Sequence, residues 1–144
     1  MATARYPRLD EEFQLILKGD LLDHQPKELP RICGYPQAGY HFTGKAETGV
    51  LVRKLKLVSV EQSFGWISLG TKLAARGKSP SGQWIMAFLD AYPDSDGRGR
   101  VGIYDDSWTD PKHDPCYPCI LKGKLCLPKA VGKFSQHVRW IVYA

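Results

Sequence analysis

Glycine and proline interrupt one region of this chain so densely that no long regular element fits there. Between residues 23 and 49 they recur every few positions, at Pro26, Pro30, Gly34, Pro36, Gly39, Gly44 and Gly49. Proline fixes φ and removes a backbone donor, and glycine loosens the backbone, so both residue types end helices and strands. We therefore expect residues 23–48 to be mostly loop, with regular structure before and after them.

The spacing of apolar residues predicts a helix over residues 10–22, with Phe13, Ile16, Leu17 and Leu21 on one face. Asp10 suits the N-cap, and Glu11 and Glu12 suit the positive end of the helix dipole. Gly19 is the residue in this range that disfavours a helix.

Short strands are expected after the loop. Residues 50–60 alternate apolar and basic side chains, which indicates a strand, and the nearly continuous apolar run 83–91 predicts a central strand. Between them, residues 64–68 suit a short strand and residues 69–77 a short helix closed by Gly77. Residues 93–100 read as a turn, with 101–104 as the hairpin partner of the central strand.

The C-terminal part predicts two further strand elements. Residues 120–127 suit a small hairpin around Lys122-Gly123-Lys124, and residues 137–144 suit a last strand. Together these elements predict one α+β domain over residues 1–144, with an N-terminal helix and a mainly antiparallel sheet or partly open barrel.

Length and composition fit this class. The chain has 144 residues, of which 43% are hydrophobic and 24% charged, as in ordinary globular domains. No apolar run approaches the roughly 18 residues of a membrane span, and the N-terminus lacks the apolar core of a signal peptide. We therefore expect an intracellular protein without a membrane partner, whose cysteines are reduced or bind metal.

The stretch His113–Cys126, HDPCYPCILKGKLC, is a candidate zinc site. Its ligands would be His113, Cys116, Cys119 and Cys126, since zinc prefers four thiolate or imidazole ligands in a tetrahedron. Cys33 or His137 are alternatives for the fourth position. Because all four positions would be occupied by protein, the zinc would be structural. The alternatives are ordinary reduced cysteines, or a thiol–disulfide pair formed by the CYPC motif.

Charge is distributed unevenly along a chain whose net charge is +5. Residues 115–144 contain no acid but five cations, Lys122, Lys124, Lys129, Lys133 and Arg139. Cations interleaved with aromatic rings are typical of nucleic-acid surfaces, so we predict that these residues and Trp140 bind an anionic partner, nucleic acid first. In a final strand Trp140 shares a face with Val142, which makes it a candidate for the core as well.

Residues 90–114 are acidic. They include seven aspartates, Asp90, Asp94, Asp96, Asp105, Asp106, Asp110 and Asp114. Such a segment could dock a basic partner, so a protein-interaction or inhibitor module is an alternative function.

Three segments also resemble parts of ADP-ribosyltransferases. They are YHFT at 40–43, WISLGTKLAAR at 66–76 and GQWIMAFLDAYP at 82–93. The resemblance implies a strand leading into a helix in the second segment and a core strand in the third. It implies that His41 contacts NAD, that Ser68 or Thr71 supports the site, and that Asp105 or Asp106 stands where such enzymes carry an acidic catalytic residue. An active or degenerate NAD-related protein is thus a second alternative, while the leading prediction remains a binding protein.

Overall fold

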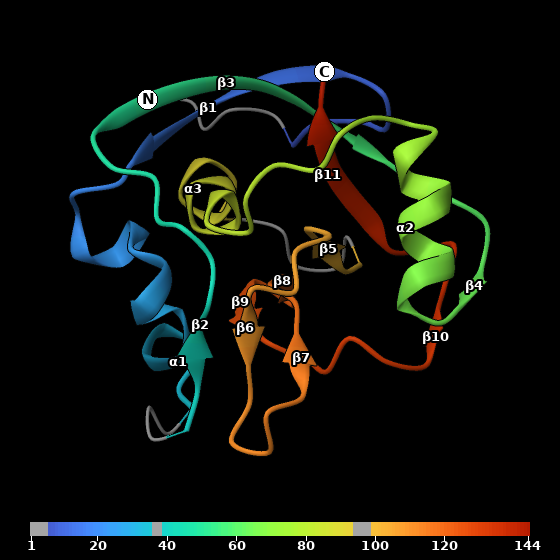
Figure 1. The fold of residues 1–144 in the computed structure, drawn as a ribbon. Helices are drawn as coiled ribbons and strands as arrows, with labels where there is room; N and C mark the ends of the chain where they lie inside the picture. Colours follow the sequence, from blue (N-terminus) through green and yellow to red (C-terminus); the bar gives the residue numbers. More distant parts are fainter. Residues whose placement is uncertain (1–5, 36–38, 94–98) are drawn as a thin grey trace.

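The computed structural model describes residues 6–35, 39–93 and 99–144. Its main feature is a six-stranded sheet in which neighbouring strands run antiparallel, except for one parallel pair, β11 and β5. The strands in spatial order are β1 (Glu12–Lys18), β3 (Val50–Val58), β11 (Arg139–Tyr143), β5 (Val101–Gly102), β8 (Cys119–Leu121) and β9 (Lys124–Cys126). The sheet curls into a half-barrel, and Figure 1 shows β1, β3 and β11 arching over helix α3 (Trp84–Ala91).

Two smaller sheets complete the strands. One joins β2 (His41–Phe42), β6 (Trp108–Thr109) and β7 (Pro115–Cys116), and the other joins β4 (Ser63–Phe64) to β10 (Lys133–Phe134). The remaining helices are α1 (Leu29–Ile32), α2 (Trp66–Ala74) and two 3₁₀ turns, η1 (Leu22–His24) and η2 (Pro26–Glu28). None of the helices in the described ranges has the length and apolar character that a membrane span requires.

Strand β11 separates two buried clusters. Ile141 packs with α3 and the concave face of the sheet, whereas Trp140 and Val142 pack with α2 on the other face. All three side chains are fully buried, because alternate residues of a strand point to opposite faces and both faces are covered here. The prediction of a strand at the C-terminal end is thus confirmed.

The predicted helix over residues 10–22 is wrong, because its centre is strand β1. The sequence EFQLILK also alternates with period two, and Phe13, Leu15 and Leu17 are buried while Ile16 is 49% exposed. Each of the seven residues of β1 is paired with a residue of β3, from Val50 to Lys56. These residues fit both the two-residue repeat of a strand and the spacing of a helix, and the structure follows the strand repeat.

The predicted central strand over residues 83–91 is also wrong, because these residues form helix α3. Trp84 to Phe88 are all buried, so the first five residues of the helix have no polar face, and Asp90 near its end is the exposed residue. The expected hairpin from this strand to 101–104 is consequently absent, and Val101 pairs with Arg139 and Ile120 instead. Most of the predicted turn, residues 94–98, lies outside the described residues.

The other expectations for strands fare better. Residues 50–58 form β3, and the hairpin predicted over 120–127 is formed by β8 and β9. Its turn residues Lys122 and Gly123 have φ of 53° and 74°, the left-handed values that a tight two-residue hairpin turn requires. The short strand predicted over residues 64–68 is extended only at its start, since β4 ends at Phe64 and α2 begins at Trp66.

Residues 23–48 are mostly irregular, as predicted, but they are held firmly against α3. The side chain of Gln83, fully buried, donates to the carbonyls of His24 (2.8 Å) and Glu47 (3.0 Å) and accepts from the amide of Glu47 (2.9 Å). The Trp108 indole donates to the carbonyl of Pro26 at 2.9 Å. Side-chain hydrogen bonds thus replace the backbone pairing that this segment lacks.

Candidate anion-binding site

A groove of about 850 Å³ lies where four segments of the chain meet, one of which contributes only Leu9. The turn after β3 (residues 59–61) forms one wall, the C-terminal half of α2 and the residues after it form a second, and residues 136–139 form the third. Its charged lining consists of Lys72, Arg76 and Arg139 against a single carboxylate, Glu61, with His137 beside them. Cations drawn from separate elements onto one concavity favour an anionic ligand.

The three cations differ in whether a carboxylate of the protein already pairs with them. Arg76 forms an ion pair with Asp10 at 2.6 Å and donates to the carbonyl of Ser59 at 2.9 Å. Lys72 donates only to a backbone carbonyl, that of Gln62, at 2.8 Å. Within the described residues neither Lys72 nor Arg139 has a carboxylate partner in an ion pair. These two side chains therefore carry most of the charge available to a ligand.

Only one of the five predicted cations, Arg139, lines this groove. Lys122 and Lys124 are exposed on the β8–β9 hairpin, and Lys133 is exposed on β10. Lys129 is neutralised by carboxylates, with Asp114 at 3.1 Å and Asp110 at 3.7 Å. The basic C-terminal stretch is thus spread over several elements.

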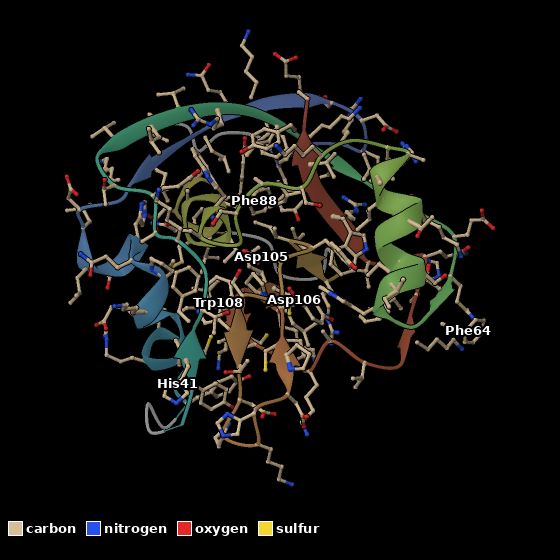
Figure 2. The ribbon with its side chains drawn as sticks, viewed as in Figure 1. His41, Phe64, Phe88, Asp105, Asp106 and Trp108 are labelled. Atoms are coloured by element: carbon tan, nitrogen blue, oxygen red, sulfur yellow. The ribbon has the colours of Figure 1, made fainter. Side chains whose placement is uncertain are left out.

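The aromatic residue predicted to stack on a ligand, Trp140, is fully buried in the cluster against α2. The exposed ring in the basic region is Phe64, which is 74% exposed and is the register partner of Lys133. Figure 2 shows Phe64 projecting from the edge of the molecule. The alternation of Trp140 with Val142 was the signal for its burial, whereas nothing in the sequence marked Phe64.

Lys72 and Arg76 were also missed by the sequence analysis. They lie four residues apart in the segment that was predicted to be a helix, so they fall on one face of it. That spacing was a usable signal. Their proximity to Arg139 has no counterpart in the sequence, since it depends on how α2 packs against β11.

The predicted zinc ligands are not gathered around one point. In residues 6–35, 39–93 and 99–144, no group of three or more histidine, cysteine or acidic side chains is placed to hold a metal ion. His113 is exposed in the turn before β7, and Cys116 packs in the cluster around α3. Burial raises the pKa of the Cys116 thiol to about 11. Zinc binding remains a prediction from the spacing alone.

Two of the four thiols do come together. Cys119 and Cys126 are register partners across the β8–β9 hairpin, and their side chains are hydrogen-bonded to each other. The hydrogen bond from Cys119, assisted by the positive charge of Arg100, lowers the pKa of the Cys126 thiol to about 7. The same bond, together with burial, raises the pKa of Cys119. The CYPC pair, by contrast, is divided between the two clusters.

The residues of the NAD-related alternative are far apart. His41 is exposed on β2, while Ser68 and Thr71 lie on α2, and Figure 1 shows these elements on opposite sides of the molecule. Segment 66–76 contains the helix that the resemblance implied, α2, but this helix begins at Trp66 without the preceding strand, and segment 82–93 contains helix α3 where a core strand was implied. Of the elements that the resemblance implied, the helix of the second segment is thus present and the core strand of the third segment is absent.

Aspartates of the acidic segment mainly brace loops. Asp105 accepts hydrogen bonds from the amides of Gly82 (2.6 Å) and Ser107 (3.0 Å), and Asp110, only 5% exposed, accepts from the amide of Lys112 at 2.8 Å. In Figure 2, Asp105 is seen near the centre of the picture, between α3 and β5. Asp106 is exposed, and Asp90 binds the ring of His24. Asp94 and Asp96 lie outside the described residues.

Comparison with known proteins assigns no family to this arrangement. No family model matches the chain, and neither a curated protein nor a solved structure matches it. Function is therefore inferred from geometry and charge.

Proposed function

We propose that this protein binds an anionic partner, nucleic acid foremost, in the groove formed by α2, the turn after β3 and the start of β11. The observation that carries the proposal is the convergence of Lys72, Arg76 and Arg139 on one concavity with a single lining carboxylate. Phosphates bound there would be neutralised by side chains from different elements, which the fold holds in place before the ligand arrives.

An exposed ring on β4, outside the lining of the groove, favours nucleic acid over a small anion. Phe64 follows Glu61 of the groove wall by three residues, and Lys133 lies across from it. Single-stranded nucleic acids bind through phosphate-neutralising cations combined with rings on which bases stack. The net charge of +5 favours encounter with the same class of partner.

The test is binding of fluorescently labelled short single-stranded RNA and DNA over a series of salt concentrations. We expect affinity to fall as salt rises, because binding releases condensed counterions. The variants Lys72→Gln and Arg139→Gln should each weaken binding and reduce the slope of log K against log salt by about 0.7, the value for one contact to a single strand. Phe64→Ala should cost about 1–3 kcal/mol, as for loss of one stacked base.

Lys45→Gln is the matched control. Lys45 is exposed in the loop between β2 and β3, so it loses the same charge away from the groove and should leave the slope unchanged. Binding that does not weaken with salt, or an equal loss in the Lys45 variant, contradicts the proposed site. If Phe64→Ala binds RNA with unchanged affinity, no base stacks on Phe64, and the argument for nucleic acid over a small anion fails.

A further inference from the structure

The two thiols of the β8–β9 hairpin face each other. The turn at Lys122-Gly123 fixes the register, because Leu121 pairs with Lys124 and the pairs continue outward to Cys119 and Cys126. Directly paired residues project from the same face of an antiparallel pair, with Cα atoms about 5.5 Å apart at a hydrogen-bonded position. Disulfides span roughly 4.4–6.8 Å between Cα atoms, so this pair is within reach of a covalent bond.

The two sulfurs differ in exposure. Cys126 is partly exposed on the edge strand β9, whereas Cys119, its register partner, is fully buried. A small oxidant from solvent would therefore meet Cys126 first, with Cys119 in place to react next. Cys116 is buried in the other cluster, where its thiol lies 3.6 Å from the carbonyl of Asp114.

We propose that Cys119 and Cys126 are a modification site, at which a hydroperoxide converts the two thiols into a reversible disulfide. The sulfur of Cys126 attacks one peroxide oxygen and the O–O bond breaks. This step leaves a sulfenic acid on Cys126 and releases the other oxygen as water or an alcohol. The sulfur of Cys119 then attacks the sulfenic sulfur, and the S–OH oxygen leaves as water with the Cys119 proton. The two thiols lose two electrons in all, and the hydroperoxide accepts them. This inference is independent of the proposed anion site.

The experiment treats the folded full chain with hydrogen peroxide, blocks the remaining thiols in denaturant, and maps peptides by mass spectrometry. Trypsin cleaves after Lys112, Lys122, Lys124 and Lys129, which separates the peptide 113–122 from the peptide 125–129. We expect these peptides to be joined, and free thiols to fall from four to two. A reducing dithiol should then restore all four.

Serine variants assign the bond, because peptide 113–122 also contains Cys116. The joined peptides should persist in Cys116→Ser and disappear in both Cys119→Ser and Cys126→Ser. Cys126 is half-buried, so its variant should keep the native circular dichroism spectrum even if the change at the buried Cys119 perturbs the fold. The proposal is overturned if four thiols remain after treatment, if Cys126 links to Cys33 or Cys116, if thiols are lost without recovery on reduction, or if denatured protein gives the same link in equal yield.

Discussion

Gly70 of helix α2 makes room for a neighbouring ring. A Cβ built on it would lie 2.5 Å from Cζ of Tyr104, which is far inside van der Waals contact. That ring stacks on Trp66 with centroids 4.1 Å apart, and its hydroxyl donates to the carbonyl of Trp66 at 2.9 Å. Because Tyr104 is held by both contacts, it cannot move aside at low cost, and the close approach requires glycine.

Gly70→Ala is therefore expected to destabilise the protein by about 1–3 kcal/mol through overpacking. At an open helix position the same change would stabilise by up to about 1 kcal/mol, because alanine is the better helix former. Denaturant unfolding measures the difference. Ser68→Ala, at an exposed position of the same helix, is the control and should be neutral or slightly stabilising. A Gly70→Ala protein as stable as wild type would contradict the close contact with Tyr104.

The cysteines show what spacing can and cannot predict at the scale of single residues. The spacing of His113, Cys116, Cys119 and Cys126 fits a four-ligand site. In the structure Cys116 packs in one cluster, Cys119 and Cys126 pack in the other, and His113 is exposed in a turn. What brings Cys119 opposite Cys126 is the Lys122-Gly123 turn, and that hairpin was predicted from the sequence. Counting residues outward from the turn would have paired the two thiols, so the signal was present in the sequence.

At the scale of elements, the seven residues of β1 fit both the helical and the strand pattern of apolar side chains. A helix would place Phe13, Ile16 and Leu17 in the core, whereas the strand buries Leu15 and exposes Ile16. The sequence fits both patterns, and the decision comes from β3, which offers a partner for every residue of β1. A partner that lies 30 or more residues away leaves no local trace.

A pair of alanine variants distinguishes the two patterns. Leu15→Ala should cost about 2–5 kcal/mol, because it removes a side chain that is 1% exposed. Ile16→Ala should cost less than about 1 kcal/mol, since its side chain is half-exposed on the outer face of the sheet. Urea unfolding of both variants makes the measurement, and the reverse order of stabilities would support a helix.

Other elements were predictable because their signals are local. Alternation identified β3, a glycine-containing turn identified the β8–β9 hairpin, and an apolar terminal run identified β11. Helix α3 was missed because its first five residues are all buried, so this stretch has no polar face and resembles a central strand. The groove was missed for a different reason, since its cations meet only through the packing of α2 beside β11.

At the scale of the whole molecule, the two buried clusters are parts of one structure. Both clusters take side chains from β3 and from β11, so neither can lose its packing without exposing the other. Shared strands of this kind favour cooperative, all-or-none unfolding.

We therefore expect a single unfolding transition. Tryptophan fluorescence and far-UV circular dichroism should give the same midpoint in urea, and Leu15→Ala in one cluster and Val142→Ala in the other should each shift both signals together. Separate midpoints for the two signals, or a variant that shifts only one of them, would show two independently unfolding parts.

The position of β11 also has a consequence for how the protein is made. β11 lies between β3 and β5 although it follows all the other strands of that sheet in the chain, so residues 139–143 fill the middle of the sheet last. While the ribosome is still adding the preceding residues, β1 and β3 are not joined within the sheet to β5, β8 and β9, and apolar side chains such as Leu57 and Val101 lack their neighbours on β11. A nascent chain that stalls before residue 139 thus presents the exposed apolar surface that chaperones and proteases recognise. Only after this strand leaves the exit tunnel can the sheet be completed and these side chains be buried.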